Sequence, residues 1–328
     1  MRAVLCKAYG PPDSLVLEDI DPPPMMAGGV RIRVRAVGVN FPDVLLIKGE
    51  YQFKPPLPFA PGGEVAGEVV EVADGVSDVA VGDRVIAGTG WGGFAEEVVV
   101  AAPSVTPIPD GMGDDVAASL FTTYGTSAYA LVDRGHLKAG ETLLVHGAAG
   151  GTGLSAVEIG KALGAVVIAT AGDDKKLEVV REHGADHVIN YSDGFKDKVK
   201  ELTGGAGADV IYDPVGGDVF DESLRCINWE GRLLVIGFAS GRIPAPPANL
   251  ILLKSCQVVG VFYGAWAMKD REGLARVYAL AGPYGAGSRS RPPGVDCCAN
   301  GPPHLHRPQR GRRTLLRVRG PAGQSAAR

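Results

Sequence analysis

A glycine-rich loop between an apolar strand and a helix constrains the fold of this chain more than any other feature. The apolar run 142–145 leads through His146 into the loop 147–153, which holds four glycines, and small or apolar residues then recur at helical spacing up to a second apolar run at 166–169. The segment from Leu143 to Ala169 has the length of one βαβ unit. The pattern therefore predicts a strand, a loop, a helix and a parallel second strand.

The same loop indicates dinucleotide binding. Ala148 stands at the first glycine of a G-x-G-x-x-G fingerprint, Gly150 lets the backbone approach a pyrophosphate, and Gly153 permits close packing of the helix. The N–H groups at the start of the helix then face the phosphates. The alternative is a turn that uses glycine for structural reasons alone.

The arrangement of apolar runs predicts an α/β fold with two domains. The first third has short alternating runs at 30–37, 65–72 and 95–100, typical of a small β-barrel. From about residue 115, helices alternate with wholly apolar strands at 142–145, 166–169, 187–190, 209–212 and 232–236. Such strands are typical of a doubly wound parallel sheet covered on both faces.

The end of the second strand bears on the choice of cofactor. NAD-binding proteins place a carboxylate there on the ribose 2′-hydroxyl, but this chain has Thr170-Ala171-Gly172, with Asp173, Asp174 and Lys175-Lys176 following. The lysines favour NADPH because they can neutralise a 2′-phosphate. In the alternative interpretation, Asp173 and Asp174 cap a helix whose exposed face carries the lysines.

The charge and composition of the chain limit which classes of protein it can belong to. Nine arginines and one aspartate give residues 282–328 a net charge of +8, which leaves −12 for residues 1–281. That tail is rich in Gly and Pro without apolar periodicity, so we expect it to be disordered. The sequence shows no membrane-length apolar run and no signal peptide, and its five cysteines match no metal-ligand spacing, so we expect a cytoplasmic protein with reduced thiols.

Six short motifs stand in order along residues 1–280. They are Asn40-Phe41-Pro42-Asp43, Gly49-Glu50-Tyr51, the segment 61–67 (PGGEVAG), the loop 147–153, the segment 213–217 (DPVGG) and the segment 260–264 (GVFYG). Together they resemble the zinc-free quinone oxidoreductases, the zeta-crystallin-like branch of the medium-chain dehydrogenase/reductase superfamily.

The resemblance implies a GroES-like catalytic domain at 1–122, continued by 252–281, around a Rossmann NADPH-binding domain at 123–251. It also implies NADPH as hydride donor, a quinone or another α,β-unsaturated carbonyl as acceptor, and a homodimer through an edge strand near 258–261. The catalytic residues it implies are Asn40, Tyr51 and Thr126. The cofactor-binding residues it implies are Ala149, Gly150, Gly151, Thr152, Gly153, Gly172, Lys176, Tyr191, Gly216, Phe238, Ala239, Phe262 and Tyr263.

Metal ligands are missing where zinc-dependent relatives have them. Asn40 stands in place of a cysteine, and Gly62-Gly63-Glu64 in place of Gly-His-Glu. Zn²⁺ prefers thiolate, imidazole or carboxylate ligands, so we predict no metal site. Without a Lewis acid, hydride addition to an electron-poor conjugated acceptor is the easier chemistry.

Several residues keep two interpretations. Tyr51 is either a proton donor or a packing tyrosine, and Leu46, which stands where several relatives have a second tyrosine, predicts a more apolar substrate pocket. His136 and His146 are interpreted as structural imidazoles, and Glu64 as a buried carboxylate with either a shifted pKa or a structural role.

The resemblance ends within 274–280, and we interpret 282–328 as an out-of-frame reading of the coding sequence. The alternative function is an NADPH-binding scaffold, or an RNA-binding protein that uses the basic tail, although nucleic acid binding is disfavoured because the tail has a single aromatic residue.

Overall fold

The computed structural model describes residues 1–270 and residue 273, in two compact units. The first unit covers Met1–Phe121, and the second begins at Thr122. The tail predicted at 282–328 and most of 271–281 lie outside the described residues. Among the residues that are described, no helix is both long and apolar enough to cross a membrane.

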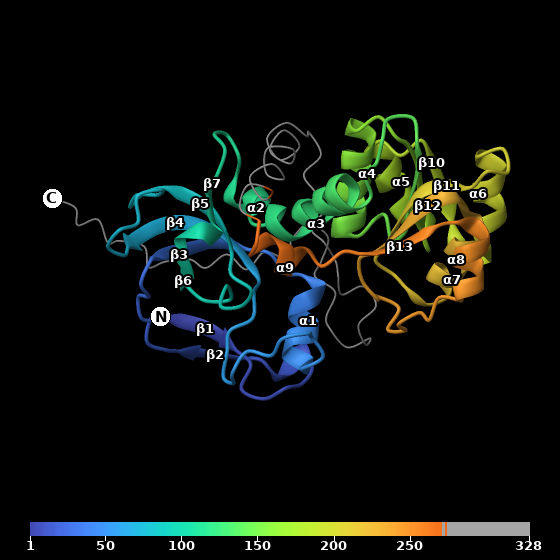
Figure 1. Cartoon of the computed structure of the whole chain (residues 1–328). Helices are drawn as coiled ribbons and strands as arrows, with labels where there is room; N and C mark the ends of the chain where they lie inside the picture. The colour runs from blue at the N-terminus through green and yellow to red at the C-terminus, as the bar shows by residue number, and fades with distance from the viewer. Residues whose placement is uncertain (271–272, 274–328) are drawn as a thin grey trace. The chain divides into compact units, whose positions relative to one another are not determined.

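The first unit is built on antiparallel strands, as the alternating runs predicted (Figure 1). Five strands pair in the order β6-β3-β4-β5-β7, and β1 pairs with β2 in a separate sheet. The strands are β1 (Arg2–Leu5), β2 (Val16–Asp19), β3 (Gly29–Val37), β4 (Glu64–Val72), β5 (Arg84–Gly88), β6 (Glu97–Ala101) and β7 (Val105–Pro107). The helices are η1 (Pro12–Ser14), α1 (Phe41–Lys48), η2 (Ala102–Ser104) and α2 (Asp114–Ala117).

Strand β3 shows why these residues form a sheet. Val30, Ile32 and Val34 are buried, whereas Arg33 and Arg35 are exposed, so the side chains alternate between core and water. The five strands do not close into a barrel through their ladders. Instead, isolated bridges join the two-stranded sheet to the rest of the unit, from Ala3 to Ala95 and from Cys6 to Phe59.

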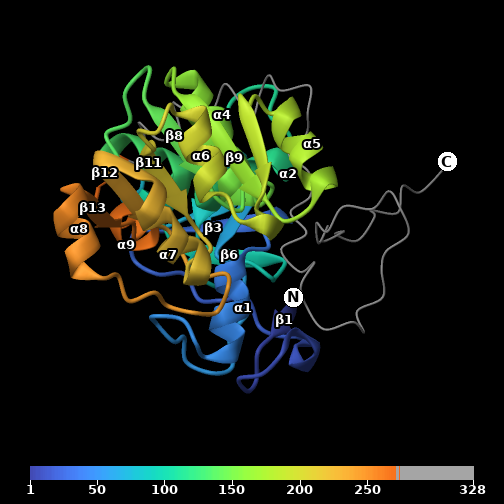
Figure 2. The same cartoon turned by 90° about the vertical axis from the view of Figure 1, so that its right-hand side faces the viewer.

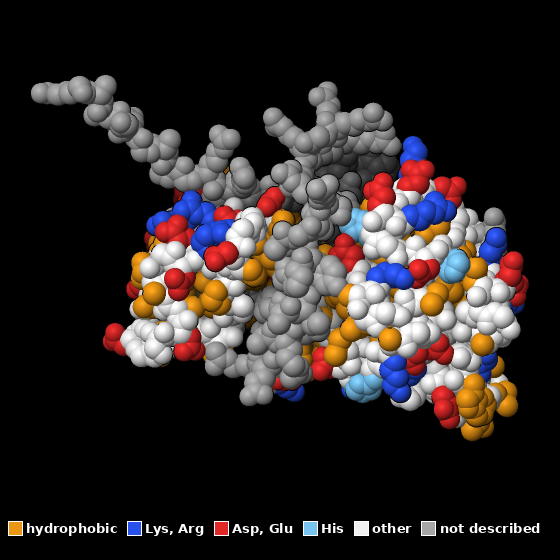
Figure 3. All heavy atoms as spheres, turned by 90° about the horizontal axis from the view of Figure 1, so that it is seen from above, with side chains coloured by type: hydrophobic (Ala, Val, Ile, Leu, Met, Phe, Trp, Pro, Cys, Tyr) orange, Lys and Arg blue, Asp and Glu red, His pale blue; other side chains and the backbone are white. Residues whose placement is uncertain are grey.

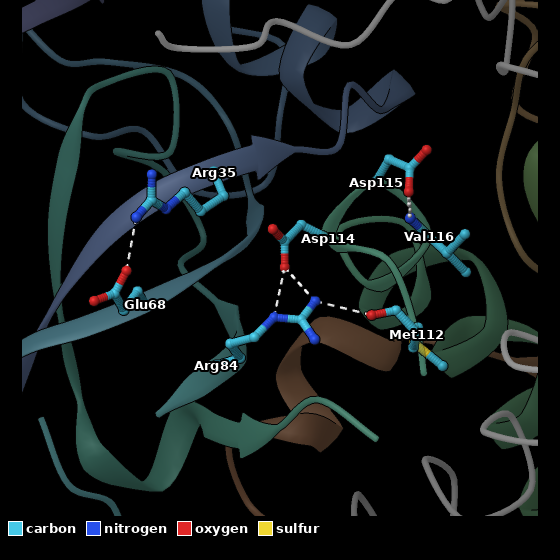
Figure 4. A network of polar contacts seen from close by, with 7 residues as sticks. All are labelled: Arg35, Glu68, Arg84, Met112, Asp114, Asp115 and Val116. Carbon is cyan, nitrogen blue, oxygen red and sulfur yellow. Dashed lines mark hydrogen bonds and ion pairs between the residues drawn. The ribbon is translucent and has the colours of Figure 1, made fainter. Parts of the chain in front are cut away.

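Ion pairs connect neighbouring elements at the surface of this unit (Figure 4). Arg35 Nη2 lies 2.7 Å from Glu68 Oε2, which joins β3 to β4. Arg84 reaches from β5 to α2, where it donates to Asp114 Oδ1 and, at 2.8 Å, to the carbonyl of Met112. These exposed pairs stabilise weakly because water screens them, so they orient the elements more than they hold the fold.

The second unit contains a six-stranded parallel sheet with helices on both faces (Figures 1 and 2). Its strands are β8 (Thr142–Val145), β9 (Val166–Ala171), β10 (His187–Asn190), β11 (Ala208–Asp213), β12 (Ile227–Val235) and β13 (Gln257–Gly260). Its helices are η3 (Leu120–Tyr124, which begins in the first unit), α3 (Gly125–Ala128), η4 (Tyr129–Arg134), α4 (Gly151–Ala162), α5 (Asp174–Glu182), η5 (Tyr191–Asp193), α6 (Lys196–Leu202), α7 (Gly217–Cys226), α8 (Ala248–Lys254) and α9 (Tyr263–Ala267).

The strand order β10-β9-β8-β11-β12-β13 is that of a dinucleotide-binding doubly wound sheet. Helix α4 packs on β8 and β9, α5 packs on β9 and β10, and α7 packs on β11, β12 and α6. The core of this unit includes Leu144, Ile168, Ile211 and Phe220. This confirms the predicted fold class. One boundary differs from the prediction: β13 pairs with β12, so this part of the 252–281 segment belongs to the parallel sheet rather than to the first domain.

Candidate functional site

The loop after β8 packs tightly against the helix that follows it. A Cβ atom at Gly153 would lie 2.3 Å from the carbonyl oxygen of Gly147 and 2.8 Å from Cα of Ala148. Because both neighbours are backbone atoms, no side-chain movement can relieve such a contact. Glycine is therefore required at position 153 for α4 to begin so close to the loop.

No side chain caps the backbone N–H groups in the first turn of α4. Gly150 is the N-cap, in an extended conformation and with no side-chain cap, and Ala149, Gly151 and Thr152 stand beside it. The first N–H groups of a helix have no acceptor within the helix, and the helix dipole makes this end positive. This arrangement is chemically suited to a pyrophosphate.

A cluster of buried hydroxyl groups, which was not predicted from the sequence, holds this turn through hydrogen bonds. Ser127 Oγ and Ser155 Oγ donate to the carbonyl oxygen of Thr152 at 2.7 and 3.0 Å. Ser127 Oγ also lies 2.9 Å from the Tyr212 hydroxyl, and burial raises the pKa of Tyr212 to about 12, so the phenol stays neutral. The cluster holds the backbone at Thr152 in one position.

The loop after β11 lies beside the loop after β8, at the point where the strand order reverses. Asp213 Oδ1 accepts hydrogen bonds from the backbone N–H groups of Val215 at 2.8 Å and Gly216 at 3.0 Å. A Cβ at Gly147 would touch Pro214 and Val215 at 3.4 Å. Ligands of doubly wound sheets bind at this switch point.

Asp213 supplies an acceptor that the described residues leave unused. Its side chain is buried, its Oδ2 has no hydrogen-bond partner within residues 1–270, and burial raises its pKa. Together with the donors at α4 and the space that Gly153 leaves, this acceptor makes the switch point chemically compatible with a dinucleotide.

The ends of β9 and β10 bring Gly172 and Tyr191 together. A Cβ at Gly172 would lie 3.2 Å from the Tyr191 ring. Asp173 Oδ1 accepts from the Lys175 N–H at 2.7 Å, so Asp173 caps α5, and this part of the capping interpretation is confirmed. Lys176 is exposed in the first turn of the same helix.

The remaining predicted cofactor residues follow the last strands of the sheet. Gly216 is the N-cap of α7 with φ of 70°, and a Cβ there would meet Phe238 at 3.1 Å. The backbone N–H of Ala239 donates to the carbonyl of Pro214 at 3.0 Å. The structure therefore brings Gly216, Phe238 and Ala239 together at the loop after β11.

Tyr263 lies against Gly125, the residue before Thr126 in the sequence. A Cβ at Gly125 would lie 2.2 Å from the Tyr263 hydroxyl, which places Tyr263 beside the start of α3, where Thr126 stands. The Tyr263 side chain is buried, whereas Phe262 is half exposed. Within this pair, Phe262 thus has the ring available to a ligand.

His146 is a structural residue, as the sequence interpretation held. It is fully buried, with Nδ1 2.9 Å from Thr170 Oγ1 and Nε2 2.8 Å from Ser223 Oγ. Burial lowers the pKa of His146 to about 3. The imidazole is therefore neutral at physiological pH.

In the first unit, Asn40 belongs to a network of carboxylates. Asn40 Nδ2 donates to Glu64 Oε1 at 2.7 Å, and the Asn40 backbone N–H donates to Asp43 Oδ2 at 2.8 Å. Asp43 Oδ1 accepts from the Gly62 N–H at 3.1 Å, and both carboxylates are buried. Burial raises the pKa of Asp43 to about 6, against the lowering effect of these backbone donors.

Asp43 was not predicted from the sequence, although its place three residues after an N-cap asparagine is a capping signal. Its carboxylate orients both the start of α1 and the 62–63 turn.

Tyr51 lies half buried beside this network. Its ring packs against the cluster of Cys6, Leu46, Ile47 and Phe59. Burial and the nearby Asp43 carboxylate both raise its pKa, so the phenol keeps its proton at neutral pH. Leu46 is 2% exposed and its side chain packs in this core, and the more apolar substrate pocket that its position predicts stays a prediction.

The donor atoms around Asn40 do not suit a zinc ion. The Asn40 amide is held by Glu64, and position 63, a glycine, offers no side chain. Within the described part of the chain, no group of three or more His, Cys, Asp or Glu side chains could hold a metal.

Comparison with known proteins gives consistent matches to both units. Residues 26–110 match the family described as alcohol dehydrogenase GroES-like domain, and residues 151–278 match the family described as zinc-binding dehydrogenase. The chain is 42% identical over 271 residues to quinone oxidoreductase-like protein 2 of Mus musculus, covering 82% of this chain and 77% of that protein.

Solved structures agree with these matches. The Escherichia coli quinone oxidoreductase complexed with NADPH has a TM-score of 0.79 at 30% identity and covers 85% of this chain and 86% of that chain. A structure of 2-haloacrylate reductase has a TM-score of 0.75 at 32% identity and covers 87% of this chain and 89% of that chain.

Proposed function

The chain belongs to the quinone oxidoreductases of the medium-chain dehydrogenase/reductase superfamily, and from this premise we propose that it reduces quinones or other α,β-unsaturated carbonyls with NADPH and without zinc. The observation that carries the proposal is the uncapped start of α4, held against the 147–150 loop by Gly153 at the switch point of the parallel sheet. This is where a dinucleotide pyrophosphate binds in such sheets.

The end of β9 supports NADPH over NADH. The position directly after β9 is Gly172, and the carboxylate of Asp173 is occupied in capping α5. Lys176 is exposed nearby and can pair with a 2′-phosphate. The relative from Escherichia coli was solved with NADPH, which agrees with this choice.

Lys176→Ala tests the cofactor preference, with Lys175→Ala as the matched control. Because a hydrogen bond to a charged group contributes about 1.5–3 kcal/mol, we expect Lys176→Ala to weaken NADPH binding by about tenfold or more. NADH binding should change by less than about twofold, because NADH lacks the 2′-phosphate, and Lys175→Ala should have the smaller effect. Equal losses for both nucleotides, measured by nucleotide fluorescence, would refute the role of Lys176.

The residues of the first unit supply the acceptor chemistry. NADPH, when bound, supplies the hydride. Tyr51 keeps its proton at neutral pH and can donate it to a carbonyl oxygen that gains negative charge, so that hydride and proton together convert a quinone to a hydroquinone. Asn40, oriented by Glu64, positions the acceptor next to this phenol.

The absence of zinc from the proposed reaction follows from the ligand chemistry. Where a zinc-dependent relative needs a thiolate and an imidazole, Asn40 and Gly63 offer an amide and no side chain. A conjugated acceptor is already electron-poor, so it accepts a hydride without a Lewis acid. The similarity to a 2-haloacrylate reductase, named for a conjugated substrate, agrees with this acceptor class.

The direct test is NADPH oxidation with 1,4-benzoquinone and with a 2-enone, together with metal analysis of the purified protein. We expect turnover of both acceptors, a reduced kcat in Tyr51→Phe, and less than stoichiometric zinc. NADPH binding without turnover of either acceptor would favour the scaffold function instead, and stoichiometric zinc would refute the metal-free reaction.

The face shown in Figure 3 gives no support to the RNA-binding alternative. On the face shown in Figure 3, Lys and Arg side chains are interspersed with Asp and Glu. Nucleic acid-binding proteins gather basic side chains in a patch or stripe. The basic tail on which that alternative rests lies outside the described residues.

A further inference from the structure

We propose that Phe53 and Trp91 form an aromatic platform, continuous with Tyr51, that binds the rings of a planar fused-ring acceptor. This inference rests on the proposed function and narrows its substrate class. It predicts that the protein prefers naphthoquinone-sized acceptors to small enones, and it makes Phe53 and Trp91 residues that determine specificity.

The three rings contact one another in turn. The Tyr51 and Phe53 rings meet edge to face, with centroids 5.1 Å apart, and the Phe53 and Trp91 centroids are 5.8 Å apart. Phe53 is 39% exposed and Trp91 is 43% exposed. Part of each outer ring is thus available to a ligand, while Tyr51 lies deeper, against the core.

Hydrogen bonds tie the platform to the network around Asn40. Trp91 lies between Gly90 and Gly92, both in the left-handed region with φ of 71° and 100°. The Thr89 and Gly90 N–H groups donate to the Gly63 carbonyl at 2.9 and 3.2 Å.

On the other side of Trp91, the Gly93 N–H donates to the Gly62 carbonyl at 3.0 Å. The Gly62 N–H is in turn held by Asp43, which also accepts from the Asn40 N–H. The Trp91 turn and the start of α1 are therefore joined through Gly62 and Asp43, which fixes the Trp91 turn relative to Asn40.

A flat aromatic molecule suits this platform better than a protein partner does. Stable protein interfaces bury about 800 Å² on each partner, whereas the platform consists of two partly exposed side chains. Aromatic rings prefer offset-stacked or edge-to-face contacts, and a quinone fused to a second ring offers both a face and an edge. A small enone has no second ring to place there.

The experiment compares two acceptors in matched variants. For 1,4-naphthoquinone, Trp91→Ala and Phe53→Ala should raise KM roughly tenfold, the effect of losing about one ring contact. For 3-buten-2-one, kcat/KM should change by less than about twofold, because this acceptor does not reach the platform. Trp91→Phe keeps a ring and should restore most of the affinity. Trp229→Ala removes an exposed tryptophan from β12 and should change neither acceptor.

A binding measurement separates this inference from the proposed function. Quenching of tryptophan fluorescence by 1,4-naphthoquinone in the presence of NADP⁺ reports binding without turnover. Trp91→Ala should raise the dissociation constant obtained from this titration. If the wild type binds naphthoquinone through Trp91 but reduces no acceptor, the platform stands and the proposed function fails.

Three results would overturn the platform. The first is an equal loss for both acceptors in Trp91→Ala. The second is unchanged naphthoquinone binding in a Trp91→Ala protein whose thermal unfolding matches the wild type. The third is a Trp91→Ala variant that changes only the oligomeric state, since this would assign the exposed rings to a second copy of the chain.

Discussion

Replacing Asp43 with asparagine should make the stability of this protein less dependent on pH. Asp43 is 4% exposed, and burial raises its pKa from 3.8 to about 6 although two backbone N–H groups donate to its oxygens. The folded state therefore holds the proton more tightly than the unfolded chain does. Asparagine has nearly the same shape and never ionises, but its amide offers one acceptor oxygen where the carboxylate uses two.

The size and sign of this change in the free energy of unfolding follow from the linkage between proton binding and folding. Because the folded-state pKa is raised, the contribution of Asp43 to stability is fully present below pH 3.8 and is lost as the pH rises towards 6. A shift of this size corresponds to about 3 kcal/mol, of which about half is lost by pH 5. Relative to the wild type, the free energy of unfolding of Asp43→Asn should therefore rise by about 3 kcal/mol between acid and pH 7. This rise adds to a pH-independent loss, because the amide NH2 cannot accept the backbone N–H that one carboxylate oxygen accepts.

Urea unfolding from pH 5 to pH 7.5 measures this difference. Asp83→Asn is the matched control, since Asp83 in the same unit also accepts from a backbone N–H, that of Ala80 at 2.8 Å, but is only half buried. This control measures how far the loss of one carboxylate in the same unit changes the curve by itself. The reasoning is refuted if the Asp43→Asn and wild-type free energies stay parallel over this range.

Two further predictions concern the second unit. Gly153→Ala places a Cβ 2.3 Å from the Gly147 carbonyl oxygen, so this variant should bind NADPH at least about tenfold more weakly. In the control Gly260→Ala, the added Cβ has no atom within 4 Å, so NADPH affinity should be unchanged. Equal NADPH affinities in a titration would contradict the role of Gly153. His146→Ala leaves the Thr170 and Ser223 hydroxyls without their imidazole partner inside the core, so urea unfolding should show a loss of about 2–5 kcal/mol. A loss below about 1 kcal/mol would show that the core repacks around the missing ring.

The parallel sheet was predictable because its signals are local. The strands at 142–145 and 187–190 have the bounds that their apolar runs predicted. Gly153 was readable from the glycine loop itself, whereas Gly172 and Gly216 were assigned to the cofactor site through the family resemblance. The cap at Asp173 was likewise readable, because an aspartate needs only its own neighbours to cap a helix.

The first unit was harder to predict because its site depends on contacts between distant segments. Leu46, for example, packs with Cys6 and Phe59, which come from other parts of the chain. The raised pKa of Asp43 depends on burial and on the turn at Gly62, neither of which its own neighbours indicate.

By itself, the sequence determined the periodic elements and the glycine loop at 147–153, because both depend on residue type and short-range spacing, and through the family resemblance it indicated the missing metal ligands at Asn40 and Gly63. Only the tertiary structure decided that Asp43 is buried under Asn40 and that Phe53 meets Trp91 across 38 positions of the chain. The physical reason is that burial, and the electrostatics and ring contacts that come with it, depend on which distant side chains exclude water from a residue, and that is decided only when the whole unit packs.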